Sequence, residues 1–207
     1  MRVAVAMSGG VDSSVAALLL REQGHDVFGL TMLTSALVAP ESGLRAAAES
    51  PAAVDARDVS RQLGIEHHVV DLSGLFENRV VAAFLREYRC GRTPNPCALC
   101  NEEVKFGALW AVAAARGAAA LATGHYARIE RLGDGQCLLL RGADRAKDQS
   151  YFLHRLSQEQ LARTLFPCGD LTKQETRGIA RSAGLQTHDR AESQEICFVP
   201  GQDHAAF

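Results

Sequence analysis

The chain has 207 residues, of which 47% are hydrophobic and 22% charged, a composition typical of a folded globular protein rather than of a disordered one. Its 22 Lys and Arg residues and 24 Asp and Glu residues give a formal net charge of −2, so total charge does not indicate a nucleic-acid partner and any basic footprint must be local. There is no apolar run of the roughly 18 residues that span a bilayer, and no secretory signal. We therefore expect a cytoplasmic protein without membrane contact.

The first part of the chain alternates between strand and helix patterns. An apolar run at Arg2–Met7 is followed by a Ser-Gly-Gly turn, a segment of helical periodicity that ends at Gly24, and a second strand at Asp26–Met32. So short a connection indicates a βαβ crossover, which requires a parallel sheet. The pattern continues with helices at Ala52–Leu63, Phe76–Cys90 and Asn101–Arg116 and strands at Glu66–Leu72 and Ala119–His125. These elements predict an α/β fold with a doubly wound, mostly parallel sheet.

The remaining segments interrupt or extend this pattern. Thr34–Pro51 is rich in Ala, Ser, Gly and Pro without a period and is predicted to be a loop. Strand-like runs at Tyr126–Leu132 and Gln136–Arg141 flank Gly-Asp-Gly, which predicts a β-hairpin excursion. Helices are expected within Asp148–Phe166 and, after the capping box of Thr172 and Glu175, up to Gly184. We place a subdomain border at residue 126, between a core at 1–125 and an extension of hairpin and helices at 126–207.

The turn between the first strand and the first helix predicts an anion site. Backbone N–H groups that have no helical partner converge there at the positive helix end, and Gly9 and Gly10 allow close approach. The hydroxyl groups of Ser8, Ser13 and Ser14 offer further donors to phosphate oxygens. Asp12 would repel a phosphate unless it bound a cation or capped the helix, and we expect both roles. Neither of the common phosphate-loop and dinucleotide motifs occurs.

Cys97 and Cys100 form a Cys-x-x-Cys pair near the predicted start of a helix, where a thiolate is favoured, and Lys105 lies further along that helix. One such pair is compatible with redox chemistry, zinc or an iron–sulfur cluster, although zinc would require further ligands. Cys197 is the third candidate. Either it carries a persulfide that Cys100 attacks, or Cys97, Cys100 and Cys197 hold three corners of a cluster. The other thiols, and two strand histidines, are interpreted as structural: Cys90, Cys137, Cys168, His67 and His68.

Five segments in matching order carry a family resemblance: SGGVDSS, GRTPNPCALCNEEVKF, ATGHYARI, LLRGADRAKDQSYFL and SQEICFV. The first resembles the pyrophosphatase loop (PP-loop) of enzymes that cleave ATP between its α and β phosphates, and all five together resemble the bacterial tRNA-specific 2-thiouridylases. This resemblance implies that ATP adenylates the wobble uridine of a tRNA and that sulfur then displaces AMP. It further implies ATP and magnesium as cofactors, and tRNA and a persulfide sulfur-relay protein as partners.

The resemblance also implies roles for particular residues. Cys100 is the implied nucleophile, Cys197 is the implied persulfide carrier, and Asp12 lies near magnesium. The implied ATP-binding residues are Ala6, Met7, Ser8, Gly9, Gly10, Val11, Asp12, Ser13, Met32 and Gly124. The implied tRNA contacts are Asn95, Pro96, Cys97, His125, Lys147, Asp148 and Gln149, of which the first three line the target base.

This chain departs from the family pattern in two ways. Some members carry aspartate at the position of Cys97, so an acid/base role is not transferred, and a cluster held by Cys97, Cys100 and Cys197 rivals the persulfide route. Family members usually continue into β-rich domains that help hold tRNA, whereas this sequence stops at Phe207, so we expect it to act without those domains or as a fragment. Two alternatives to a tRNA 2-thiouridine synthase therefore stay open: another tRNA thiolase with the same loop, and an ATP-binding or sulfur-carrier module without turnover.

Overall fold

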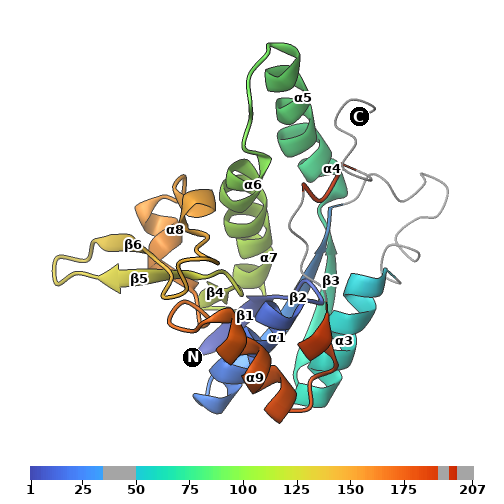
Figure 1. Cartoon of the computed structure of the whole chain (residues 1–207), viewed down its shortest axis with the longest axis vertical. Coiled ribbons are helices and arrows are strands. Elements are labelled where there is room, and N and C mark those ends of the chain that lie inside the picture. Colours follow the sequence, from blue (N-terminus) through green and yellow to red (C-terminus); the bar gives the residue numbers. More distant parts are fainter. Residues whose placement is uncertain (35–49, 191–195, 200–207) are drawn as a thin grey trace.

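The computed structural model of the protein describes residues 1–34, 50–190 and 196–199 (Figure 1). The strands are β1 Arg2–Ala6, β2 Asp26–Leu33, β3 Glu66–Asp71, β4 Ala120–Ala122, β5 Ala127–Arg131, β6 Cys137–Arg141 and β7 Thr164–Leu165. The α-helices are α1 Val11–Glu22, α3 Pro51–Leu63, α4 Ser73–Phe76, α5 Ala82–Arg89, α6 Pro96–Leu99, α7 Trp110–Ala115, α8 Gln158–Ala162 and α9 Lys173–Ser182. Two π-helical segments, η1 Glu77–Val81 and η2 Cys100–Leu109, and two 3-10 turns, η3 Ser150–Leu153 and η4 Gln186–Asp189, complete the fold.

The central sheet has five parallel strands in the order β3-β2-β1-β4-β7. The α/β prediction is therefore confirmed. The sheet also contains a strand, β7, where the periodicity predicted only helices within Asp148–Phe166. Two residues are too few to show an alternating pattern. β7 forms because its two residues pair with Leu121 and Ala122 of β4. β7 comes from the chain beyond the predicted border at residue 126, so both sides of that border contribute to the sheet.

Helices cover both faces of the sheet, because alternate residues of a buried strand point to opposite sides. Val3 and Val5 of β1 pack into a core that also contains residues of α1, α3 and α9. Ala4 between them packs into a second core, formed with η2, α7, α8 and the β5-β6 hairpin. The hairpin itself is antiparallel and lies outside the parallel sheet, as predicted.

The strand order reverses direction next to β1. From β1 the chain proceeds through β2 to β3 on one side, and β4 and β7 lie on the other side. The connections that leave β1 and β4 at their carboxyl ends therefore diverge, and this divergence opens the crevice in which doubly wound sheets bind ligands. The predicted phosphate loop follows β1, and Gly124 follows β4.

The helix that carries the Cys-x-x-Cys pair begins earlier than predicted. It starts at Pro96 rather than Asn101 and runs through α6, η2 and α7 to Ala115. Asn95 is its N-cap, and the Asn95 side-chain oxygen accepts a hydrogen bond from the Ala98 N–H at 3.1 Å. Asn followed by Pro is a standard helix start, so Pro96 is the first residue of this helix.

The loop predicted at Thr34–Pro51 lies mostly outside the described residues. Ser50, at its end, caps α3 by accepting a hydrogen bond from the Ala53 N–H at 3.4 Å. The predicted capping box of Thr172 and Glu175 is present at the start of α9. Among the described helices, none has the length and apolarity of a membrane span.

Candidate functional site: a phosphate loop and a pair of thiols

The loop after β1 has the backbone geometry of an anion site. Gly9 has a positive φ of 72°, and a Cβ atom there would lie 2.4 Å from the Ala52 carbonyl oxygen, so only glycine fits. Gly10 is the N-cap of the 12-residue helix α1, and no side chain caps the first N–H groups of that helix. These N–H groups and the positive end of α1 are the features that bind phosphate groups in such loops.

The serine hydroxyl groups of the loop are used within it. Ser13 Oγ and Ser14 Oγ both donate to the Gly10 carbonyl oxygen, at 3.2 and 2.8 Å, and Ser13 Oγ accepts from the Ser8 N–H at 3.2 Å. Ser14 is fully buried. Ser14 therefore stabilises the loop and is not the phosphate donor that the sequence predicted, whereas Ser8 is exposed.

Asp12 is held by an ion pair that the sequence did not predict. Lys173 Nζ lies 2.7 and 2.8 Å from the two carboxylate oxygens of Asp12, and the Tyr126 hydroxyl donates to one of them at 2.8 Å. The Lys173 side chain is only 11% exposed. Asp12 does not cap α1, so that expectation is wrong. Lys173 already neutralises this carboxylate without a metal ion. The proximity of Asp12 to magnesium stays a prediction.

One feature of the sequence indicates that Lys173 has an acidic partner. This residue is the first residue of α9, where the helix dipole disfavours a positive charge. A lysine at that position is stabilised by a nearby carboxylate, but only the tertiary structure identifies Asp12 as the partner.

The other predicted ATP-binding residues gather at the same edge of the sheet. A Cβ atom at Gly124 would lie 2.6 Å from both Asp12 C and Ser13 N, so the end of β4 packs directly on the start of α1. Ala6, Met7 and Val11 belong to β1, the loop and α1, and Met32 lies near the end of β2. Thr31 Oγ1 donates to the Met7 carbonyl oxygen at 2.9 Å and joins β2 to the loop.

His67 is a structural residue, as predicted, and supports this loop. Its Nε2 atom lies 2.8 Å from Thr31 Oγ1. Because the single Thr31 hydroxyl proton is donated to Met7, His67 must donate from Nε2. Burial, with smaller contributions from Arg57 and His68, lowers the pKa of His67 to about 4. The ring is therefore neutral at pH 7 and carries the proton that this hydrogen bond needs.

The three candidate thiols share one environment. Cys97 and Cys100 lie on the first turns of the helix that begins at Pro96, and Cys100 is 8% exposed. Phe198, directly after Cys197, packs edge-on against Phe76 at 5.6 Å and against Phe84 at 5.3 Å between ring centroids. These rings and Cys100 belong to one apolar cluster. The structure thus brings Cys197 to Cys100 from a distant part of the chain.

The thiols are protonated at neutral pH. Burial raises the pKa of Cys100 to about 11, against the opposing influence of Lys105, and the neighbouring Cys197 and Cys97 raise it further. Partial loss of hydration likewise raises the pKa values of Cys97 and Cys197, although both residues keep exposed surface. The expectation that the helix start favours a thiolate is wrong for this structure, because the loss of hydration outweighs both Lys105 and the helix end.

The three thiols do not form a metal site in this structure. Among the described residues, no group of three or more His, Cys, Asp and Glu side chains is arranged to hold a metal ion. A cluster held by Cys97, Cys100 and Cys197 stays a prediction. The six cysteines are all free thiols, so no disulfide joins Cys100 to Cys197 here.

Several predicted tRNA contacts have structural partners. Asp148 Oδ1 accepts from the Gly142 N–H at 3.0 Å and from the Ser150 N–H, and Gln149 Oε1 accepts from the Tyr126 N–H at 3.0 Å. His125 Nδ1 lies 2.7 Å from Thr123 Oγ1, and burial lowers its pKa well below the usual range. His125 is thus neutral and contributes no positive charge to phosphate binding. Asn95 acts through its helix cap, and Pro96 is buried beside exposed Cys97.

A family model described as "tRNA methyl transferase HUP domain" matches residues 1–201. The chain belongs to this family. Two relatives of the family are named tRNA-specific 2-thiouridylase MnmA. The one from Geobacter metallireducens is 52% identical over 210 residues and the one from Geotalea uraniireducens is 50% identical, and each match covers 100% of this chain. The matches cover only 57% and 56% of those relatives, so the chain spans about half the length of the curated relatives it matches.

Two solved structures illustrate the fold that this chain shares with known proteins. The U34-tRNA thiolase NcsA from Methanococcus maripaludis, solved with its [4Fe-4S] cluster, has a TM-score of 0.56 at 19% identity, covering 95% of this chain and 61% of that one. A 4-thiouridine synthetase in complex with RNA and bound ATP has a TM-score of 0.54 at 20% identity, covering 95% of this chain and 44% of that one. At this level of identity the family shares the fold with them.

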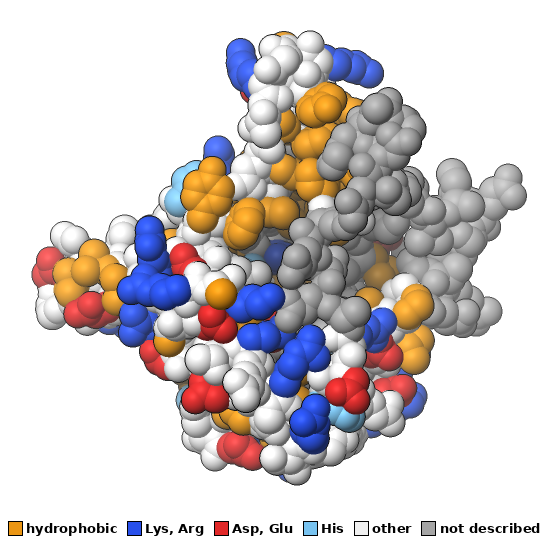
Figure 2. Space-filling model, viewed as in Figure 1, with side chains coloured by type: hydrophobic (Ala, Val, Ile, Leu, Met, Phe, Trp, Pro, Cys, Tyr) orange, Lys and Arg blue, Asp and Glu red, His pale blue; other side chains and the backbone are white. Residues whose placement is uncertain are grey.

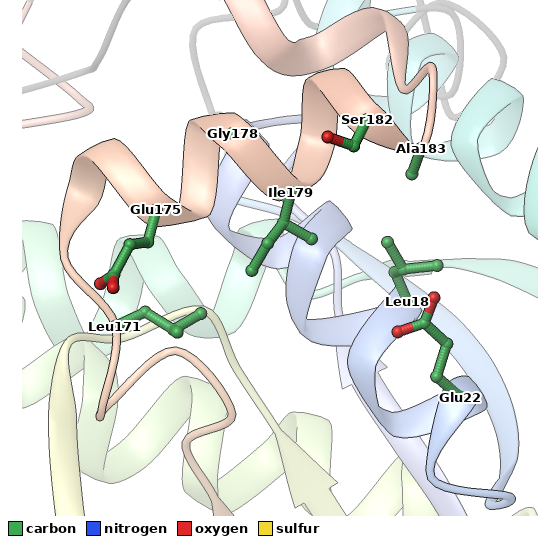
Figure 3. Close-up of a pocket in the computed structure, with 8 residues that line it drawn as sticks. All are labelled: Leu18, Glu22, Leu171, Glu175, Gly178, Ile179, Ser182 and Ala183. Carbon is green, nitrogen blue, oxygen red and sulfur yellow. The ribbon is translucent and has the colours of Figure 1, made fainter.

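A separate groove lies between α1 and α9 (Figure 3). Leu18, Leu171 and Ile179 contribute apolar side chains to it, and the Glu22 and Glu175 carboxylates lie along it. None of the predicted site residues lines this groove. The candidate site of this family member is therefore the crevice at the carboxyl ends of β1 and β4, together with the cluster around Cys100.

Proposed function

We propose that this chain is the ATP-binding and sulfur-transferring part of a tRNA 2-thiouridine synthase. The observation that carries this proposal is the combination of two features: a phosphate loop at the point where the sheet order reverses, and Cys100 in one apolar cluster with Phe198, whose neighbour Cys197 lies close enough to influence the pKa of Cys100. The similarity to 2-thiouridylases over the whole chain supports the same activity. The required partners are a tRNA and a persulfide relay protein, both in the cytoplasm.

The first step is adenylation. The uridine 2-carbonyl oxygen attacks the α-phosphorus of ATP, and pyrophosphate leaves. The N–H groups of Gly9, Gly10 and the start of α1 bind the phosphates, because no side chain caps this end of the helix. The Ser8 N–H already donates to Ser13 Oγ. Magnesium, which accompanies ATP, would reduce the repulsion between the phosphate charges. We assign Gly124 and Met32 to the same nucleotide site because they lie at the ends of the adjacent strands.

The second step is sulfur transfer. The relay protein supplies a persulfide on Cys197, whose terminal sulfur attacks C2 of the adenylated uridine and displaces AMP. Cys100 then attacks the Cys197 sulfur, which forms a Cys100–Cys197 disulfide and releases 2-thiouridine; an external thiol reduces the disulfide. Asn95, Pro96 and Cys97, beside Cys100, are the residues proposed to line the target base. Because burial holds the pKa of Cys100 at about 11, attack requires a base or tRNA-induced exposure.

The test uses Cys100→Ser and Cys197→Ser. Each variant is expected to release pyrophosphate from ATP in a tRNA-dependent way but to form no 2-thiouridine, measured by nucleoside mass spectrometry. Cys90→Ser, which changes an exposed cysteine outside the cluster, serves as the matched control and should keep full thiolation. Continued 2-thiouridine formation by either site variant would remove that cysteine from the mechanism.

The alternative function is a module that binds ATP without turnover. Unchanged pyrophosphate release on addition of tRNA, with ATP still bound, would support this module over the synthase.

A further inference from the structure

Two consecutive aromatic rings are exposed on the turn η3. Tyr151 is 68% exposed and Phe152 is 36% exposed, and they are two of only five large hydrophobic side chains exposed among the described residues. Their ring centroids lie 5.7 Å apart, and the His154 ring lies 5.8 Å from that of Tyr151. Leu153, which is buried, anchors the turn in the core. An exposed cluster of this kind marks a contact surface rather than a packing surface.

The surrounding hydrogen bonds hold these rings in place. Ser150 donates to Asp148 from its N–H and its hydroxyl group, at 3.2 and 2.9 Å. Asn101, the residue after Cys100, is buried and donates from Nδ2 to the Phe152 carbonyl oxygen at 2.9 Å. The turn also contacts α6, which carries Cys97. The aromatic surface is therefore attached to the helix of the candidate nucleophile.

The charge around the rings is positive. The segment from Arg145 to Arg155 contains three cationic side chains, Arg145, Lys147 and Arg155, and one carboxylate, that of Asp148. Arg155 is paired with Glu102, so Arg145 and Lys147 supply the positive charge beside the rings. That carboxylate accepts hydrogen bonds within the loop. Figure 2 shows hydrophobic surface between the positions of α6 and α8, with Lys and Arg side chains beside it. Aromatic faces bordered by cations are the features with which proteins bind unpaired RNA bases.

We propose that Tyr151 and Phe152 form a stacking platform for an unpaired RNA base that neighbours the base reacting at Cys100. The inference deepens the proposed function and rests on it. The roles in the KDQSYF segment then differ from those predicted. Asp148 and Gln149 stabilise the turn, and the two aromatic rings contact RNA. A protein partner is the alternative occupant, but the positive border favours a polyanion.

The first experiment measures binding of an anticodon stem-loop RNA that contains uridine at the wobble position. Tyr151→Ala should raise the Kd about 5- to 100-fold, the range expected for loss of one stacked base. Tyr151→Trp should keep or improve the affinity, whereas Tyr151→Leu, which retains apolar area without an aromatic face, should resemble Tyr151→Ala. Tyr88→Ala is the matched control, because Tyr88 is 50% exposed on a different helix, α5; its Kd should equal that of the unchanged protein.

Salt dependence and fluorescence separate stacking from a merely structural role. Tyr151→Ala should leave the slope of log Kd against log salt unchanged, whereas Lys147→Gln should reduce it by about one ion. The chain has a single tryptophan, Trp110. In a Trp110→Phe background, RNA should quench the fluorescence of the tryptophan introduced by Tyr151→Trp. It should not quench the fluorescence of the tryptophan introduced by Tyr88→Trp.

The possible outcomes distinguish failure of the stacking platform from failure of the proposed function. If the unchanged protein binds the RNA and Tyr151→Ala binds it equally well, the platform is overturned while the proposed function stands. If the unchanged protein binds no RNA, both fail. If Tyr151→Ala binds RNA normally but loses binding to a persulfide relay protein, the rings form a protein docking surface and the platform is again overturned. Weakened RNA binding with recovery by Tyr151→Trp supports it.

Discussion

At the scale of single residues, the ion pair of Asp12 and Lys173 is the feature that most changes the interpretation of the loop. Lys173 bonds both oxygens of Asp12 and also lies 5.6 Å from the Tyr126 ring centroid. A carboxylate beside a phosphate site would repel the ligand, and Lys173 cancels that charge within the protein. The pair also joins α1 to α9, so it fixes the start of α1.

This pair leads to a stability prediction. Lys173→Met leaves Asp12 partly buried and unpaired, so we expect a loss of about 1–3 kcal/mol in the free energy of unfolding. Combining it with Asp12→Asn removes the unpaired charge, and the double variant should be more stable than the sum of the two single losses implies. Urea unfolding of the four proteins measures this coupling. Strictly additive losses would show that the two groups do not interact.

At the scale of elements, the helix that carries Cys97 and Cys100 is unusual because it widens into the π-helical segment η2 at Cys100. Wide turns of this type often occur at functional sites. Gln160 supports this one: its Nε2 donates to the Glu102 and Phe106 carbonyl oxygens at 2.8 and 3.3 Å. Its Oε1 accepts from the Ser157 N–H and completes the capping box of α8.

The two functions of Gln160 can be separated. Gln160→Glu keeps an acceptor for the Ser157 N–H but loses the donor to η2, so we expect a loss of about 1 kcal/mol in stability and faster reaction of Cys100 with a thiol reagent. Glu175→Gln makes the opposite exchange in the matching capping box of α9 and should change neither quantity appreciably. Urea unfolding and the rate of thiol labelling measure both. An unchanged labelling rate would mean that Gln160 does not restrain η2.

The sequence predicted the elements whose signals are local. The Ser-Gly-Gly turn between β1 and α1, the hairpin around Gly135, whose φ is 87°, and the Thr172 capping box all depend on neighbouring residues. What it missed depends on distant contacts: β7 exists only through pairing with β4, and the partner of Lys173 is remote in sequence. The raised pKa of Cys100 was missed for the same reason, since burial is a property of the folded chain.

At the scale of the whole molecule, the candidate site depends on how closely the two sides of the sheet approach each other. The end of β4 and the start of α1 are in contact at Gly124, where a Cβ atom would lie 2.6 Å from Ser13 N. Much of the predicted site could be placed from the sequence, because parallel strands bring their carboxyl ends to one edge. The approach of Cys197 to Cys100 required the fold, since the contacts of the neighbouring Phe198 with Phe76 and Phe84 hold this distant segment there.

Gly124→Ala tests this contact. The added methyl group must push the start of α1 away from β4, so we expect a loss of about 1–3 kcal/mol in stability and at least tenfold weaker ATP binding. Gly133→Ala is the control, because a Cβ atom at Gly133 meets nothing within 4 Å and its φ is not positive. Thermal unfolding and calorimetric titration with ATP measure the two effects. Normal ATP affinity in Gly124→Ala would place the nucleotide elsewhere.

The shortness of β7 has a consequence for behaviour at high concentration. This strand forms one outer margin of the sheet with only two residues, Thr164 and Leu165. An edge strand exposes unpaired main-chain N–H and C=O groups, to which a strand of another molecule can form hydrogen bonds. A short edge strand exposes few of these groups. We therefore expect this side of the molecule to resist aggregation, in contrast to the opposite margin, β3, which is six residues long.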